Sequence, residues 1–319
     1  MSALLELHGL EVEIEGLPIL RGVDLEVRPG EILGVVGETG AGKSMTARSI
    51  LDLLPAKATL SFEECTFGGE DFIPARARQL ARGHRIGFVP QRPRGSLNPV
   101  FRVGKQIVDT LRRLRGMTRK QARDEALNLL RSVRITDPER VYRSYPHELS
   151  GGMCQRVCIA IALAGEPELI IADEPTTGLD VTIQAEILKL LGEVIVEHNA
   201  AGMLITHDLG VVADVCDRVA VMYAGRVINL GTTVEIYREA LHPYANQLVS
   251  IASSLDSGGT PQEIPGRVPN PGDELAACAF APRCFRAEDD CFQQEPPLVQ
   301  IEGQMAFCHH PLTSEVVSV

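Results

Sequence analysis

A glycine-rich stretch near the N-terminus places the strongest constraint on how this chain can fold. Residues Gly37–Ser44 read GETGAGKS and fit the phosphate-loop pattern G-x-x-x-x-G-K-[ST]. The stretch follows an apolar run, Ile32–Val36, that favours a buried strand, and it leads into Lys43–Leu54, which favours a helix. A strand, a glycine turn and a helix in this order predict an α/β fold that binds a nucleotide phosphate at the helix N-terminus.

The loop supplies most of the predicted nucleotide contacts. Its glycines allow backbone N–H groups to wrap around the phosphates. Lys43 is expected to reach the β- and γ-phosphates, and the Ser44 hydroxyl is expected to bind Mg²⁺. The residues expected to contact the nucleotide here are Gly37, Glu38, Thr39, Gly40, Ala41, Gly42, Lys43, Ser44 and Met45.

A pair of carboxylates follows a second apolar run. Residues 169–172 read LIIA and favour a buried strand that ends at Asp173 and Glu174. An aspartate at this place can hold Mg²⁺, and a glutamate beside it can polarise an attacking water. The alternative is a plain helix start, because acids favour that position and Pro175 follows. With a phosphate loop in the same chain, catalysis is the preferred interpretation.

The rest of the chain up to about residue 252 alternates between strand-like and helix-like segments. Thr182–Glu197 favours a helix and Met203–Thr206 a strand, which together indicate a largely parallel sheet. A few segments differ from this alternation. Leu4–Ile14 and Gly22–Val27 favour an antiparallel sheet, Val219–Tyr223 and Arg226–Leu230 a hairpin, and Val103–Leu114 and Lys120–Val133 two helices.

Composition excludes some classes of protein. The net charge of −11 argues against a nucleic-acid binder, which needs a basic face to meet phosphates. No stretch approaches the roughly 18 apolar residues of a membrane span. The start, MSALLELHGL, lacks the basic and apolar regions of a signal peptide, so a cytoplasmic chain is expected.

Five motifs together resemble the ABC-type ATPases, over roughly residues 4–250. Besides the phosphate loop these are Leu149–Met153 (LSGGM, the signature with Met in place of Gln), Asp173–Asp180 (DEPTTGLD), Gln91 and Thr206–Asp208 (THD). The resemblance implies a P-loop ABC ATPase fold with a mostly parallel sheet core, an N-terminal antiparallel β subdomain and a helical subdomain at about residues 95–160. It also implies ATP as the nucleotide.

The resemblance also implies roles for these residues. Ser150, Gly151 and Gly152 would bind the γ-phosphate of an ATP held by a partner subunit, and Asp180 would cross the interface between the two. Gln91 would touch Mg²⁺ or water, Glu174 would activate the water, and His207 would sense the γ-phosphate. The family's aromatic adenine contact is missing, since residues 11–20 contain no aromatic side chain. Ile14 or Leu17 is the expected substitute.

Further segments resemble the ATP-binding subunits of bacterial peptide importers. They are Ser96–Pro99, His242–Tyr244 and Cys278–Cys284. This resemblance implies a subunit on the cytoplasmic face of the membrane that powers import of oligopeptides or dipeptides. The implied partners are two transmembrane permease subunits, an extracytoplasmic peptide-binding protein and a second ATPase subunit, a paralogue rather than a copy. Arg92 and Arg94 fall where such subunits meet the permease, although solvated surface is an equal alternative.

Two rival functions stay open. The same machinery could import nickel or another small solute, because cargo is selected by other subunits. A soluble ABC ATPase acting on nucleic acid or ribosomes is the second rival. The single ATPase unit and the acidic balance of the chain count against it.

Four cysteines lie in a proline-rich C-terminal module, residues 253–319, which follows an ATPase domain at residues 1–252. Cys278, Cys284, Cys291 and Cys308 have the spacing C-x₅-C-x₆-C-x₁₆-C, and four thiolates suit a [4Fe–4S] cluster or tetrahedral zinc. The family's C-terminal pattern implies the iron–sulfur cluster, which would replace a missing core. Unligated thiols and a substitution by His309 or His310 are the alternatives. The other cysteines, Cys65, Cys154, Cys158 and Cys216, are expected to be buried hydrophobes.

Overall fold

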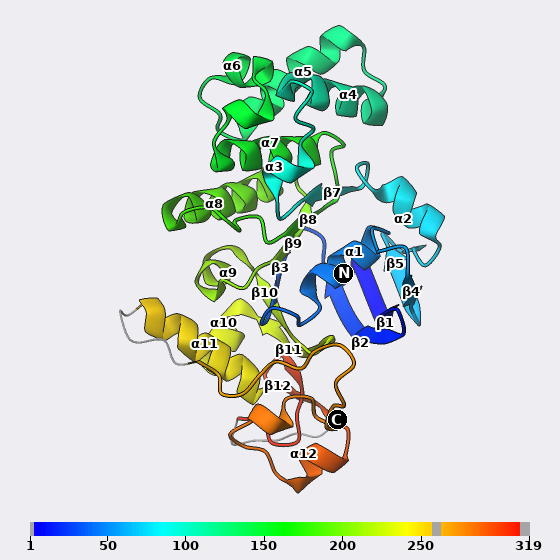
Figure 1. Cartoon of the computed structure of the whole chain (residues 1–319), viewed down its shortest axis with the longest axis vertical. Coiled ribbons are helices and arrows are strands. Elements are labelled where there is room, and N and C mark those ends of the chain that lie inside the picture. The colour runs from blue at the N-terminus through cyan, green and yellow to red at the C-terminus, as the bar shows by residue number, and fades with distance from the viewer. Residues whose placement is uncertain (1–2, 257–262, 313–319) are drawn as a thin grey trace. The chain divides into compact units, whose positions relative to one another are not determined.

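The computed structural model describes residues 3–256 and 263–312 and separates into two compact units (Figure 1). The first, here called the loop unit, comprises Met1–Val27, Ile32–Ile73 and Thr206–Val319. The second, the middle unit, comprises Arg28–Glu31 and Pro74–Ile205.

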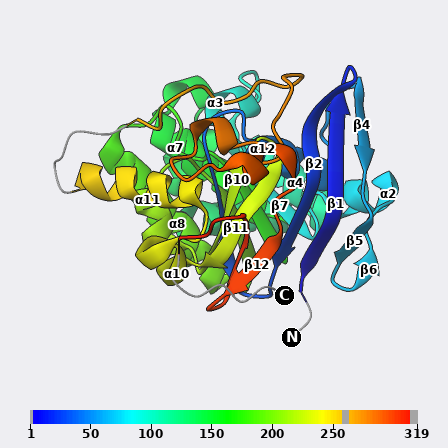
Figure 2. The same ribbon diagram turned by 90° about the horizontal axis from the view of Figure 1, so that it is seen from below.

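An antiparallel sheet opens the loop unit (Figure 2). β1 (Leu5–Ile14) pairs with β2 (Leu17–Val27) along its whole length, and β4 (Ala58–Ser61), β5 (Glu64–Phe67) and β6 (Glu70–Asp71) complete the sheet. Burial alternates along β1, as the polar and apolar alternation of its sequence predicts. The second strand begins at Leu17 rather than at Gly22, because the tight turn at Glu15 and Gly16, both at positive φ, returns the chain at once.

A second group of strands in the loop unit carries the phosphate loop. β3 (Ile32–Val36) is wholly buried and runs parallel to β10 (Arg218–Tyr223), which forms the predicted hairpin with β11 (Arg226–Thr232). α1 (Lys43–Ile50) follows the loop and ends earlier than predicted, since Asp52 takes a left-handed φ of 52°. The same unit contains α9 (Leu209–Val215), α10 (Thr233–Glu239) and α11 (Pro243–Asp256).

Three parallel strands form the centre of the middle unit, in the order β9 (Ala201–Ile205), β8 (Leu169–Asp173) and β7 (Ile86–Val89). Every residue of β8 and β9 is buried, which explains their unbroken apolar sequences. The helices are α2 (Ala75–Ala81), α3 (Pro93–Ser96), α4 (Val103–Arg115), α5 (Arg119–Ser132), α6 (Pro138–Arg143), α7 (Gly151–Leu163) and α8 (Val181–Glu197). The two helices predicted at Val103–Leu114 and Lys120–Val133 are thus confirmed as α4 and α5.

The C-terminal region of the chain joins the loop unit. It contains α12 (Asp289–Gln293) and a hairpin of β12 (Leu298–Ile301) and β13 (Gln304–Phe307), and β13 pairs with β11. A small apolar cluster forms between the hairpin and the start of α11, from Leu241, Val299, Ile301 and Ala306. The expectation of a region with no core is therefore wrong, because the hairpin buries one face against residues that precede it in the chain. None of the helices among the described residues is long and apolar enough to cross a membrane.

Candidate nucleotide site

The phosphate loop has a backbone shape that requires glycine at two positions. Gly37 has a φ of 148°, and a Cβ atom there would lie 2.3 Å from the Met222 carbonyl oxygen of β10. Gly42 has a φ of 106°, and its Cβ would lie 2.6 Å from Leu20 Cδ2. Any larger side chain at either position would push the loop away from the strands beside it.

Lys43 lies inside the curve of the loop. Its Nζ donates hydrogen bonds to the Gly37 and Glu38 carbonyl oxygens, at 2.7 and 3.0 Å, and the residue is 4 % exposed. Ser44 follows in the first turn of α1, and the Ala41 N–H closes the loop onto the Glu38 carbonyl oxygen at 3.2 Å. The Lys43 ammonium group therefore lies at a helix N-terminus, where it can bind a phosphate.

The middle unit brings Glu174 and Gln91 into direct contact. Gln91 Nε2 donates to Glu174 Oε2 at 2.7 Å, and Thr177 Oγ1 lies 3.0 Å from the same oxygen. Glu174 also has a left-handed φ of 42°, and its N–H donates to the Ile205 carbonyl oxygen at 2.8 Å. The side chains of Gln91 and Thr177 therefore hold the Glu174 carboxylate at the end of β8. The neighbouring Asp173 is 2 % exposed.

The signature turn and the segment at Asp180 lie against each other, also within the middle unit. Ser150 caps α7 by accepting from the Met153 N–H at 3.2 Å, and Asp180 caps α8 by accepting from the Ile183 N–H at 3.0 Å. A Cβ on Gly152 would lie 2.8 Å from Ile183 Cγ2, so the two helix starts are in close contact. Both line an open groove of about 720 Å³.

Two predicted contacts lie on the surface of the loop unit. His207 is exposed. The next residue, Asp208, is the N-cap of α9, and its carboxylate accepts from the Val211 N–H at 3.4 Å. Leu17, one of the two candidates for an adenine contact, is 45 % exposed, and Ile14 is partly buried. Each is therefore accessible to a ligand.

Arg94, considered above as a docking residue, has a partner in its own chain. One of its guanidinium nitrogens donates to the Leu149 carbonyl oxygen at 2.9 Å, directly before the signature turn. Arg92 is exposed.

Two contacts of the loop could not be predicted from the sequence. Tyr244 accepts a hydrogen bond from the Glu38 N–H at 2.8 Å, and Arg283 binds the Glu38 carboxylate through two nitrogens, at 2.7 and 3.0 Å. Both residues stood in segments noted only for their family resemblance. Contacts across 206 and 245 residues of sequence carry no local signal that could have revealed them.

The four C-terminal cysteines are close enough to influence one another electrostatically. Burial, and then the thiols of Cys278, Cys284 and Cys291, raise the pKa of Cys308 to about 12. The Cys278 N–H donates to the Cys291 carbonyl oxygen at 2.9 Å, and the Arg286 N–H donates to Cys284 Sγ at 3.4 Å. The other cysteines are buried as predicted.

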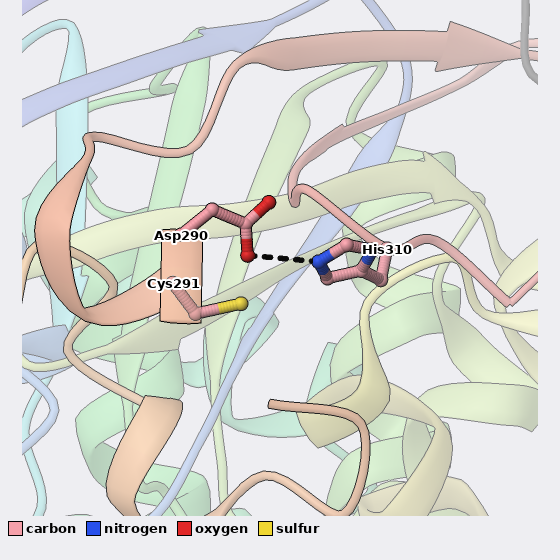
Figure 3. Close-up of side chains that lie close together, drawn as sticks. All are labelled: Asp290, Cys291 and His310. Atoms are coloured by element: carbon pink, nitrogen blue, oxygen red, sulfur yellow. Dashed lines mark hydrogen bonds and ion pairs between the residues drawn. The ribbon is translucent and has the colours of Figure 1, made fainter. Parts of the chain in front are cut away.

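A smaller group of donors adjoins this set (Figure 3). Figure 3 shows the Asp290 carboxylate facing His310, with Cys291 beside it, and the three ligand atoms lie within 4.8 Å of one another. His310 Nε2 is 2.9 Å from Asp290 Oδ1. His309 and His310 are partly buried, and each is bonded to the region around α12.

Comparison with known proteins agrees with the geometry. The family model described as ABC transporter matches residues 20–177, and that described as oligopeptide/dipeptide transporter, C-terminal region, matches residues 228–291. The chain is 44 % identical to a probable peptide ABC transporter ATP-binding protein of Sinorhizobium fredii, covering 99 % of this chain and 97 % of the relative. It is 40 % identical to the oligopeptide transport ATP-binding protein of Salmonella typhimurium, covering 98 % and 95 %.

A solved structure extends the comparison to the fold. A dimeric ATP-binding cassette in a post-hydrolysis state, bound to ADP and Pi, superposes with a TM-score of 0.62 at 28 % identity. The match covers 72 % of this chain and 98 % of that one. Fold and motifs together therefore define a P-loop ATPase of the cassette type.

The wider similarity places the chain more narrowly. It belongs to the ABC transporter family, among the ATP-binding proteins that carry the oligopeptide/dipeptide C-terminal region. The predicted family, fold class and ATPase activity are thereby confirmed.

Proposed function

We propose that this chain hydrolyses ATP to drive import of oligopeptides or dipeptides through a separate membrane permease. The observation that carries the proposal is the C-terminal match over residues 228–291, together with near full-length similarity to ATP-binding proteins named for peptide transport. Nickel or another small solute would use the same machinery, but the relatives reported above are named for peptides.

In the proposed reaction Lys43 and the backbone N–H groups of Gly37–Ser44 bind the β- and γ-phosphates. Ser44, Asp173 and Gln91 are the residues that would hold Mg²⁺, which would supply charge to stabilise the leaving phosphate oxygens. Glu174 polarises the attacking water and takes its proton as water adds to the γ-phosphorus and the bond to ADP breaks. The hydrogen bonds from Gln91 and Thr177 support this role, because they orient the carboxylate.

The proposed catalytic unit is a dimer of cassettes. Ser150, Gly151 and Gly152 present a capped helix N-terminus in an open groove, which suits the γ-phosphate of an ATP on the facing subunit. Asp180 lies in the same groove and would reach across the interface, and His207 would contact the γ-phosphate in its own subunit. We propose a paralogue as the facing subunit, with two permease subunits and an extracytoplasmic peptide-binding protein, at the cytoplasmic face of the membrane.

Uptake measurements test the cargo. In a strain lacking the gene, restoring the wild-type chain should restore uptake of radiolabelled di- and oligopeptides, and the control Glu139→Gln should do the same because Glu139 is an exposed ion-pair residue. Glu174→Gln should restore none. Recovery of radiolabelled nickel uptake without peptide uptake would show that the proposed peptide cargo is wrong. Co-purification with RNA or ribosomes instead of membrane subunits would reject the transport function itself.

We also propose that Cys278, Cys284, Cys291 and Cys308 hold a [4Fe–4S] cluster. The donor set suits the cluster, because the four partly or fully buried thiols interact electrostatically and burial raises the pKa of each, and a bound cation would stabilise their thiolates. Such a cluster would cross-link the segments that carry these cysteines. Zinc is the alternative group for the same thiols.

Anaerobic purification tests the cluster. The full chain should be brown, with broad visible absorption and about four iron and four sulfide per chain. Cys284→Ser should lower the iron content and bleach the colour, whereas Cys65→Ser, a buried thiol on β5, should leave both unchanged. A colourless protein with one zinc per chain would show that the four thiols hold zinc and not an iron–sulfur cluster.

A further inference from the structure

Glu38, the second residue of the phosphate loop, is held by the C-terminal part of the chain from two sides. Its N–H donates to the Tyr244 hydroxyl at 2.8 Å, and its carboxylate forms a two-pronged ion pair with Arg283 at 2.7 and 3.0 Å. All three residues belong to the loop unit. The backbone and the side chain of one loop residue are thus both anchored by residues more than 200 positions away.

Arg283 is fixed in place before it meets the loop. Its side chain is only 4 % exposed, and its guanidinium donates to the Pro265 and Ile264 carbonyl oxygens, at 2.9 and 3.1 Å, and to the Tyr223 hydroxyl at 3.3 Å. These hydrogen bonds fix the planar guanidinium of Arg283 in one orientation. The ion pair is therefore unlike an exposed one, in which both side chains move freely.

Tyr244 is equally constrained. The residue is fully buried, and its ring contacts those of Tyr223 and Phe280, with centroids 4.7 and 5.2 Å apart. Its N–H donates to His242 Nδ1 at 3.1 Å, and burial lowers the pKa of His242 to about 3, so this nitrogen stays an acceptor at neutral pH. Aromatic packing and this bond hold the hydroxyl in front of the loop.

Glu38 is important to the loop for two reasons. Its carbonyl oxygen accepts from both Lys43 Nζ and the Ala41 N–H, so a shift of Glu38 would move the lysine that meets the phosphates. Its carboxylate would also repel an incoming triphosphate, and the Arg283 charge offsets that repulsion. We infer that Arg283 and Tyr244 are positioning residues which hold the phosphate loop in its binding shape, so that the C-terminal region sets ATP affinity within its own chain.

A double-mutant cycle on the full chain tests the ion pair, with a fluorescent ATP analogue as the probe. Arg283→Gln should raise the Kd by about tenfold or more, because it leaves a carboxylate without its cation beside the phosphates. Glu38→Gln should have a smaller effect. The double variant should match Glu38→Gln rather than show the product of both effects. The control Arg267→Gln removes a guanidinium whose side chain is 73 % exposed and which pairs with Asp273 in the same region, and it should leave the Kd unchanged.

Tyr244→Phe tests the second anchor and keeps the ring packing. It removes the hydroxyl that bonds Glu38, including the acceptor for its N–H, and we expect a severalfold rise in Kd, with the turnover rate at saturating ATP nearly unchanged. Circular dichroism shows whether Arg283→Gln folds. If it does not, Tyr244→Phe alone tests whether the C-terminal region positions the loop. A Kd within twofold of wild type for a folded Arg283→Gln or Tyr244→Phe, or strictly multiplicative effects in the cycle, would overturn the inference.

Discussion

Glu174→Gln is expected to keep ATP binding and to lower hydrolysis by about 10²- to 10⁴-fold. The amide has nearly the shape of the carboxylate, so it can still meet Gln91 and Thr177, which contact Glu174 at 2.7 and 3.0 Å. It cannot take a proton from the attacking water, and this is the step that should fail. Phosphate release from the assembled transporter and ATP binding to the same sample measure the two effects separately.

The matched control for this variant is Glu139→Gln, a charge removal at an exposed pair with Arg131. It should hydrolyse ATP at the wild-type rate. Normal hydrolysis by Glu174→Gln would show that another group activates the water. Loss of binding together with hydrolysis would show that the carboxylate shapes the site, rather than acting only on the water.

Lys43→Ala is expected to weaken ATP binding by about 100-fold or more. Its ammonium group would supply charge-assisted hydrogen bonds to the phosphates, each of which is stronger than a neutral one. The loop should also lose shape, since Nζ bonds two of its carbonyl oxygens, of Gly37 and Glu38. Titration with a fluorescent ATP analogue gives the affinity directly.

Lys105→Ala is the control, because this lysine forms an exposed i,i+4 pair with Asp109 on α4. Its affinity for ATP should equal that of the wild type. Near-normal binding by Lys43→Ala would mean that backbone N–H groups alone carry the phosphate affinity, and the proposed role of Lys43 would then be wrong.

Much of the fold was predictable because short-range patterns determine it. The unbroken apolar sequence of Ile32–Val36 predicted β3 with its observed limits, and the change to helical spacing after Val103 predicted α4 and α5. Errors arose where one residue overrides a pattern. Asp52 has a φ of 52°, which is incompatible with a helix, so α1 ends at Ile50 although the apolar spacing continues to Leu54.

The site divides in the same way. Motifs such as Gly37–Ser44 and Ser150–Gly152 are contiguous in sequence, and their local geometry could be predicted. The anchors on Glu38 could not, because Tyr244 and Arg283 come from distant elements whose approach depends on the packing of Tyr223 and Phe280. The core of the C-terminal region was missed for the same reason, since Leu241, which packs with Val299, Ile301 and Ala306, lies outside the region.

The pairing of β13 with β11 has a practical consequence for anyone who wishes to shorten this protein. Asn229 of β11 is 1 % exposed, and its amide nitrogen donates to the Met305 carbonyl oxygen at 3.0 Å. A version cut after residue 252 would leave that amide without this acceptor and would open a strand edge to solvent. A minimal cassette made by such a cut would therefore be prone to self-association, and a usable design would need to retain the hairpin or replace the edge with charged residues.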